Sequence, residues 1–194
     1  MAGNGKRRGP LVIGAVLVAL VLAGVGLYWF QPWKLWQNET INEALPGGAA
    51  PAAASSASPG GSGASGAPAA KPSAASGPQT LSQGTLISHE HATTGSVKIV
   101  RLADGSHTLR LENLDTSNGP DLRVLLTDAP VKEGVAGWRV FDDGKHISLG
   151  KLKGNKGDQN YTIPADVKLS EYTSVSIWCD RFDVSFGAAE LAQA

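Results

Sequence analysis

The hydrophobic pattern divides the chain into three unlike parts. Residues 11–30 form one apolar run without a charged side chain. Residues 46–78 show no hydrophobic periodicity and consist almost entirely of Ala, Gly, Pro and Ser. From residue 79 onward, short runs of alternating apolar and polar residues are separated by turn residues, which is typical of β-strands. This order predicts a membrane-spanning helix, a linker and a β domain.

The apolar run is long enough to cross a bilayer, since its twenty residues would span roughly 30 Å as a helix. Lys6, Arg7 and Arg8 precede it, and such residues stay on the cytoplasmic side. We therefore expect residues 1–10 to be a cytoplasmic basic N-terminus and residues 11–30 to be a single-pass cell-membrane anchor. A cleaved signal peptide is the alternative, although this run exceeds a usual signal core and no clear small-residue cleavage site follows it.

Residues 31–45 are expected to be a juxtamembrane segment. Trp33 and Trp36, together with Tyr28 and Trp29, fit an aromatic belt at the outer membrane interface. Residues 34–45 are expected either to extend the helix or to lie at the interface.

Residues 46–78 are expected to be a disordered linker. Their composition cannot bury enough apolar surface to offset the entropy lost on ordering. A flexible coil of this length reaches roughly 30 Å. The linker is therefore expected to let the following domain swing near the membrane.

Residues 79–194 are expected to form one extracytoplasmic all-β domain. Asp104 and Gly105 predict a tight turn that joins two alternating runs into a hairpin. Residues 128–145 are expected to be a long loop. Seven or eight short, mostly antiparallel strands indicate a sandwich or a barrel. The predicted strands cover residues 84–89, 97–102, 107–112, 122–127, 146–152, 160–164, 173–179 and 182–186.

The charge balance of this domain argues against a nucleic-acid partner. From residue 79 onward there are twelve basic and fifteen acidic side chains, whereas a nucleic-acid-binding domain would carry a basic face. The sequence also lacks a phosphate loop, a dinucleotide fingerprint and a Gly-x-Ser-x-Gly motif. These absences give no support to a stand-alone enzyme.

Cys179 is the single cysteine of the chain, so it cannot form an internal disulfide. Strand alternation places it on one face with Val175 and Ile177, and free cysteine is often buried as a small apolar residue. However, Asp180 and Arg181 follow it, where a turn would expose the sulfur and Arg181 would favour the thiolate. Three interpretations remain open: a buried apolar residue, a reactive thiol and a ligand.

The histidines supply further candidate ligands. In a strand, His89 and His91 would share a face, and two histidines with one cysteine form the ligand set of a blue-copper site. A cysteine or histidine also suits haem as an axial ligand. The sequence has no Cys-x-x-Cys-His, no His-Glu-x-x-His and no clustered zinc spacing, and its single methionine is Met1. The identity of any metal stays unknown, and no cofactor, haem or copper are all chemically allowed.

Several stretches of the domain match a known family in order and spacing. They are HATTG at 91–95, NGPDL at 118–122, LGKLKGNKGDQNY at 149–161, YTSVSIWCDRF at 172–182 and FGAAEL at 186–191. On these stretches, the domain resembles the electron-transfer DM-thirteen family, a Skeletor-type extracellular domain, over about residues 83–191. The family occurs beside DOMON domains in animal proteins and in bacterial secreted proteins. The resemblance implies a β-rich domain with a proposed extracellular redox role.

The resemblance also implies site residues. It places the redox centre at Cys179, as a bare thiol or as a ligand to a prosthetic group, with His91 as a further cofactor-binding candidate. Other candidates are Trp178, Asn118, Gly119, Pro120 and Asp121, for which packing or turn formation is the structural alternative.

The expected function is that of a membrane-anchored extracytoplasmic redox or electron-transfer module. The chain shows no DOMON or cytochrome-like domain, so an unidentified redox or cell-envelope protein is expected to act in trans. The alternative is a non-redox cell-surface binding module in which Cys179 is buried and structural. Accessibility of this thiol distinguishes the two.

Overall fold

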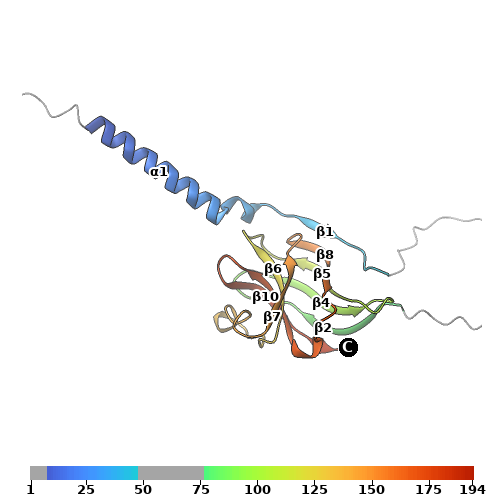
Figure 1. Cartoon of the computed structure of the whole chain (residues 1–194). Coiled ribbons are helices and arrows are strands. Elements are labelled where there is room, and N and C mark those ends of the chain that lie inside the picture. The colour runs from blue at the N-terminus through green and yellow to red at the C-terminus, as the bar shows by residue number, and fades with distance from the viewer. Residues whose placement is uncertain (1–7, 48–76) are drawn as a thin grey trace, which may run out of the picture.

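The computed structural model describes residues 8–47 and 77–194 of the chain (Figure 1). In these residues, one long helix leads into two β-sheets that pack face to face. The expected cytoplasmic N-terminus and the expected linker lie mostly outside the described residues.

Helix α1 (Arg8–Phe30) carries almost no polar side chain, and its described side chains are nearly all exposed. It is the one helix among the described residues that is long and apolar enough to cross a membrane. A signal sequence near the N-terminus would satisfy the same criteria. Gln31 ends the helix with a left-handed backbone at φ 44°, and the 3₁₀ helix η2 (Pro32–Trp36) follows. The helix is therefore compatible with a single-pass anchor.

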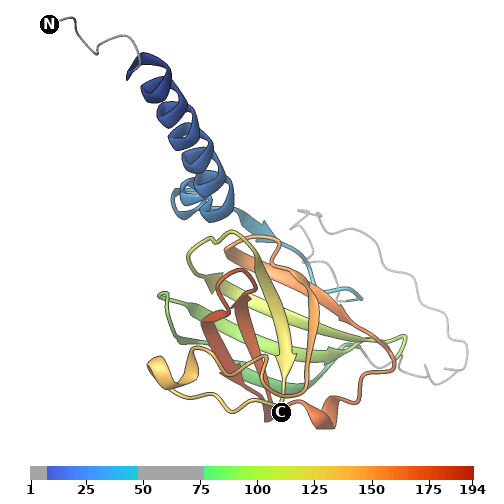
Figure 2. The same cartoon turned by 60° about the vertical axis from the view of Figure 1, so that its left-hand side comes forward.

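Two sheets make up the β domain, and Figure 2 shows them from the side of the helix. The first sheet has the strand order β1 (Thr40–Asn42), β8 (Lys156–Ile163), β5 (His107–Asp115), β4 (Thr94–Arg101), β2 (Gln79–Thr85) and β11 (Ala192–Gln193). The second has the order β3 (Ile87–Ser88), β10 (Val184–Glu190), β9 (Ser174–Cys179), β6 (Leu122–Thr127) and β7 (His146–Lys151). Apart from the parallel pair β1–β8, the described strand pairs are antiparallel.

The all-β sandwich class is confirmed, with eleven strands in the described residues instead of seven or eight. The added strands are short pieces at the sheet edges. The predicted hairpin is β4–β5, whose turn contains Gly105 at φ 85°. The predicted loop at 128–145 holds only the short 3₁₀ helix η3 (Val135–Gly137), and η4 (Leu169–Glu171) precedes β9.

The main core lies between the sheets. It contains Val97, Leu109 and Leu111 of the first sheet and Val124 and Ile177 of the second, all fully buried. A second apolar cluster lies on the outer face of the second sheet, where the loop at 128–145 covers it; its buried members are Leu125, Ala129, Phe141, Trp178 and Ala188. Because both faces are covered, every residue of β9 is buried.

The segment expected at the membrane interface is partly a strand of the domain. Thr40 and Ile41 of β1 pair with Lys156 and Gly157 of β8. The residues at 46–78 therefore connect β1 to β2 and do not join the anchor to the domain. The expectation that the domain swings on this linker does not fit this path of the chain.

Candidate functional site

Cys179 is the last residue of β9, where the strand lies between β6 and β10. Its Cα is paired with Leu122 on one side and Val184 on the other. The side chain is 0% exposed and lies in the main core with Val175 and Ile177, the face that strand alternation predicts. The sulfur therefore has no direct access to solvent.

The turn at residues 180–183 closes over the end of β9. The Asp180 amide donates to the Asp121 carbonyl at 3.0 Å, and the Phe182 amide donates to the Cys179 carbonyl at 3.2 Å. Asp183 has a left-handed backbone at φ 49°, and the chain then returns as β10. The expectation that this turn exposes the sulfur is not met.

Burial raises the pKa of the Cys179 thiol above its ordinary value. The backbone N–H groups of Arg181, Phe182 and Asp121 act in the opposite direction, with a smaller effect. The Arg181 side chain points to the anchor, because its guanidinium lies 5.2 Å from the centre of the Trp29 ring and donates to the Trp29 carbonyl. Cys179 is therefore a neutral thiol at pH 7.

His89 and His91 point to different parts of the domain, since β3 ends before them. His91 packs on Phe186 with ring centroids 4.0 Å apart. His89 is buried, with Nδ1 2.8 Å from the Ser185 hydroxyl oxygen and its ring 5.6 Å from that of Phe141. The expected shared face is therefore wrong.

His89 has a structural role in the second cluster. Burial lowers the pKa of His89 below its ordinary value, and a hydrogen bond to the Lys132 carbonyl opposes this shift. That carbonyl lies 3.1 Å from Nε2 and can only accept, so Nε2 carries the proton. Nδ1 then faces the Ser185 hydroxyl as an acceptor and shares its proton with the Gly187 carbonyl oxygen, to which that hydroxyl donates at 3.1 Å. The neutral ring thus links the loop at 128–145 to β10.

The described residues do not assemble a metal site. No group of three or more His, Cys, Asp or Glu side chains in residues 8–47 and 77–194 could hold a metal ion. Cys179 faces the core, whereas His91 packs on Phe186 and His89 belongs to the second cluster. This arrangement does not fit the two-histidine, one-cysteine set of a blue-copper centre.

A cavity of about 310 Å³ opens beside His91, between the end of α1 and the sandwich. We call it the His91 cavity. The end of α1 and the residues after it supply Phe30, Gln31, Pro32 and Lys34. The sandwich side supplies Glu90, His91, Gly119, Pro120, Phe182 and Phe186. Phe30 and Phe182 are stacked with centroids 5.8 Å apart. The cavity is thus mainly aromatic and apolar, with a few polar groups at its wall.

The loop predicted from the sequence borders this cavity. Gly119 and Pro120 line it, and the Gly119 amide donates to the Asn118 side-chain oxygen at 2.8 Å. A Cβ at Gly119 would lie 3.1 Å from the Phe186 ring. Glycine therefore allows the loop to pack closely against the Phe186 ring, on which His91 also packs.

Asp121 and Trp178 face away from this cavity. The Asp121 carboxylate lies 3.3 Å from the Arg123 guanidinium and 3.4 Å from the Lys151 ammonium. Trp178 is 2% exposed and meets Phe141 edge-on, with centroids 6.5 Å apart. Trp178 belongs to the second cluster, so it does not shield the thiol.

Sequence reasoning missed Phe186 and the end of the anchor as parts of this site. Phe186 follows the alternating pattern of a core residue, which hides its contact with His91. Phe30 and Lys34 lie in a segment that the sequence assigns to the membrane and its interface. The pairing of β1 with β8 brings Phe30 and Lys34 to the sandwich.

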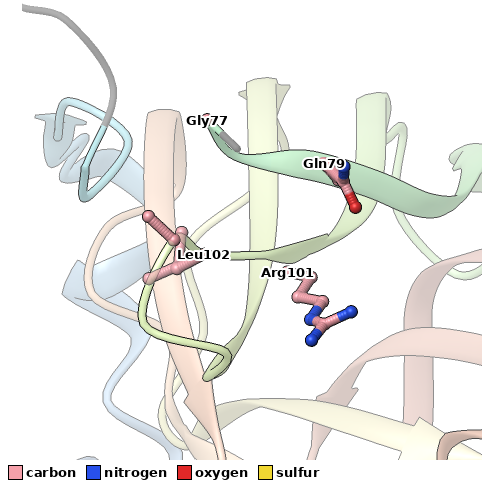
Figure 3. A pocket seen from close by; sticks show the side chains of 5 residues that line it. Gly77, Gln79, Arg101 and Leu102 are labelled. Atoms are coloured by element: carbon pink, nitrogen blue, oxygen red, sulfur yellow. The ribbon is translucent and has the colours of Figure 1, made fainter. Parts of the chain in front are cut away.

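A second cavity, of about 320 Å³, lies at the opposite end of the first sheet (Figure 3). It forms where Gln79 at the start of β2 pairs with Arg101 at the end of β4. Gly77, Leu102 and Ala103 complete its described lining, which contains neither cysteine, histidine nor carboxylate. This cavity is therefore the weaker candidate.

A family model described as "Electron transfer DM13" matches residues 85–191, which is more than half of the chain. No curated protein matches the chain. No solved structure matches it either.

Proposed function

Because the chain belongs to the electron-transfer DM13 family, we propose that it is a membrane-anchored extracytoplasmic electron-transfer module with Cys179 as its redox centre. The observation that supports this most is the family match, which covers nearly the whole sandwich, Cys179 and His91 included. Helix α1 would be the anchor, and the basic residues before it would keep its start in the cytoplasm. The redox partner would be a separate protein of the membrane or envelope.

Burial restricts the chemistry of Cys179 to moments when the turn at 180–183 moves aside. A neutral, enclosed thiol is a poor nucleophile. Once exposed and deprotonated, its Sγ would attack a disulfide of an envelope protein. A bond forms between Sγ and one partner sulfur, the partner disulfide breaks, and the second partner sulfur leaves as a thiolate that takes up a proton. Cys179 is oxidised and the departing sulfur is reduced.

A non-redox binding module is the second candidate function, and the complete burial of Cys179 favours it. In this case the cysteine fills the core, and the His91 cavity receives a ligand or a side chain of a partner. The volume of that cavity, about 310 Å³, is at the lower end of the usual range for ligand pockets.

The two functions predict different behaviour of Cys179. They are distinguished by measuring visible absorption, bound metal and thiol alkylation on the full chain, purified in detergent or nanodiscs, beside the Cys179→Ala variant. A visible absorption band and bound metal that the variant lacks would establish a prosthetic group on this cysteine. A colourless chain whose native thiol is alkylated at a measurable rate would support thiol chemistry. A colourless chain with an inert native thiol, which reacts only after unfolding, would overturn the redox proposal and leave the binding module.

A further inference from the structure

The edge of β8 that receives β1 makes several polar contacts with the membrane-proximal segment at 38–44. The Glu39 amide donates to the Asn155 side-chain oxygen at 2.7 Å, and the Lys156 amide donates to the Glu39 carbonyl at 3.1 Å. The Glu43 amide donates to the Asp158 carbonyl at 2.9 Å. The backbone of the segment is thus held before and after β1.

Glu43 is the most heavily bonded side chain of the segment. Its carboxylate accepts from the Lys153 ammonium at 2.7 and 2.9 Å and from the Asn160 amide at 2.8 Å. Arg110 donates to the Glu43 carbonyl at 3.0 Å. Partial burial alone would raise the pKa of Glu43, but the bonds with Lys153 and Asn160 lower it overall. The edge therefore recognises an acidic side chain at this position.

Two glycines make room for the segment. A Cβ at Gly154 would lie 2.5 Å from the Glu39 carbonyl oxygen. A Cβ at Gly157 would collide with the Ile41 carbonyl oxygen, and this residue has φ +91°. An ordinary side chain at either position would block β1.

Asn155 would lose partners without the segment. It is 1% exposed, and its amide nitrogen donates to the Asn38 side chain at 2.8 Å and to the Thr116 carbonyl at 2.7 Å. Its oxygen accepts from Glu39. An empty edge would lose the bonds from Glu39 and to Asn38, and water would have to replace them. Asn155 lies within the family match at 85–191, whereas the bound segment lies outside it.

The bound segment is close to the anchor along the chain. Nine residues separate the end of α1 at Phe30 from the start of β1 at Thr40, a span of about 30 Å at most. The Phe30–Phe182 stack and the contact of Arg181 with Trp29 join the helix end directly to the turn over Cys179. The His91 cavity lies at this junction.

We propose that the β8 edge is a binding site for an extended acidic segment, that its occupant is the chain's own residues 38–44, and that this docking keeps the His91 cavity at the bilayer surface. The site is a case of strand addition to a sheet edge, in which main-chain bonds supply affinity and side chains supply selectivity. It rests on the proposed role of α1 as the membrane anchor, and it stands whether or not Cys179 is redox-active. A partner of this chain would then reach the His91 cavity at the membrane surface.

The orientation of the sandwich relative to the bilayer is tested by NMR on the full chain with ¹³C-labelled histidine. The chain is placed in nanodiscs whose lipids carry a nitroxide headgroup, which broadens the signals of nearby nuclei. His91 lies at the helix end of the sandwich. His107 pairs with Arg101 at the far end of β4, about 20 Å away along the strands. The nitroxide should broaden the His91 ring signal strongly and the His107 signal weakly. Equal broadening of both signals would overturn the proposed orientation.

Docking of the segment is tested by amide hydrogen exchange on the same sample. Gly154→Ala and Glu43→Ala should raise exchange of residues 39–43 by about tenfold or more and should remove the difference between the two histidine signals. Gly77→Ala and Glu133→Ala are matched controls, because a Cβ at Gly77 meets no neighbour and Glu133 is exposed. Unchanged β4 and β5 protection shows that the sandwich is folded.

Two outcomes would overturn the binding site. In the first, residues 39–43 of the unmodified chain exchange as fast as unstructured peptide. In the second, both test variants keep the protection and the histidine difference of the controls. If Gly154→Ala disturbs the fold of the sandwich, Glu43→Ala still tests the site, because Glu43 lies on the bound segment outside the family match.

Discussion

At the scale of single residues, the surroundings of Cys179 decide its chemistry. Its sulfur lies in an apolar core, and the backbone groups around it do not offset the effect of burial on its pKa. Movement of the turn at 180–183, which closes over the end of β9, would expose this sulfur. Phe182 holds that turn by packing on the core and stacking on Phe30.

Loosening this turn should make the thiol more reactive. We expect Phe182→Ala to raise the alkylation rate of native Cys179 about tenfold, because a loss of about 1.4 kcal/mol in closing free energy changes the open population by that factor. The rate is measured on the full chain in detergent under native conditions. Val135→Ala, at a 74% exposed position, is the control. An unchanged rate in Phe182→Ala would mean that the turn does not control access.

His89 should make stability depend on pH. The pKa of His89 is lower in the folded chain than in the unfolded chain, so the unfolded chain binds a proton more readily. The free energy of unfolding is therefore highest above the unfolded pKa of about 6.5 and decreases as the pH falls below that value. We expect the urea midpoint to fall between pH 7 and pH 5, and to fall less in His89→Gln. His146→Gln, at an exposed histidine, should keep the full decrease. If the urea midpoint decreased equally with pH in both variants, this role of His89 would be contradicted.

At the scale of elements, the strands differ in how far the sequence could predict them. The β4–β5 hairpin and β9 follow period-two alternation between local turn signals. β1 was missed because it is three residues long and its partner β8 lies more than a hundred residues later. The second cluster was missed for a related reason, since the loop at 128–145 shows no periodicity that would predict its packing on β9.

Arg110 links the elements of the first sheet. It lies on β5, is 8% exposed, and donates to Glu112 on its own strand at 2.9 Å and to Asp158 on β8 at 2.8 Å. We expect Arg110→Ala to lower the free energy of unfolding by about 1–3 kcal/mol, because both acidic partners lose a charged donor and are themselves only partly exposed. Urea unfolding measures this. Arg101→Ala, at an exposed position, should have little effect, and equal losses would contradict the account.

At the scale of the whole molecule, the sequence predicted the long apolar helix and the β domain but not how the chain connects them. Composition identifies the linker without saying which strands it joins. The pairing of β1 with β8 means that residues 46–78 connect β1 to β2, and it brings the end of α1 to the His91 cavity. Of the candidate residues, His91 and Gly119 line this cavity, whereas Asp121 and Trp178 do not, and their roles stay predictions. Which residues line the same cavity depends on packing between segments that are far apart in the sequence.

The orientation proposed for the chain rests on the basic residues before α1. We expect alkaline phosphatase fused after Ala194 to be active in a bacterial host, because Lys6, Arg7 and Arg8 keep the N-terminus in the cytoplasm. Replacing these three residues with glutamate should reduce that activity several-fold. A fluorescent protein that matures only in the cytoplasm, fused at the same point, should give the opposite result. An inactive phosphatase fusion on the unmodified chain would contradict the topology.

The central claim is that Cys179 exchanges electrons, and mediated coulometry on the full chain in nanodiscs tests it most directly. The chain is first oxidised with a small disulfide and then titrated, beside a folded Cys179→Ala variant. The account predicts reversible electron uptake by the unmodified chain and none by the variant. If the two titrations are identical, Cys179 is a structural core residue and the chain does not act through it.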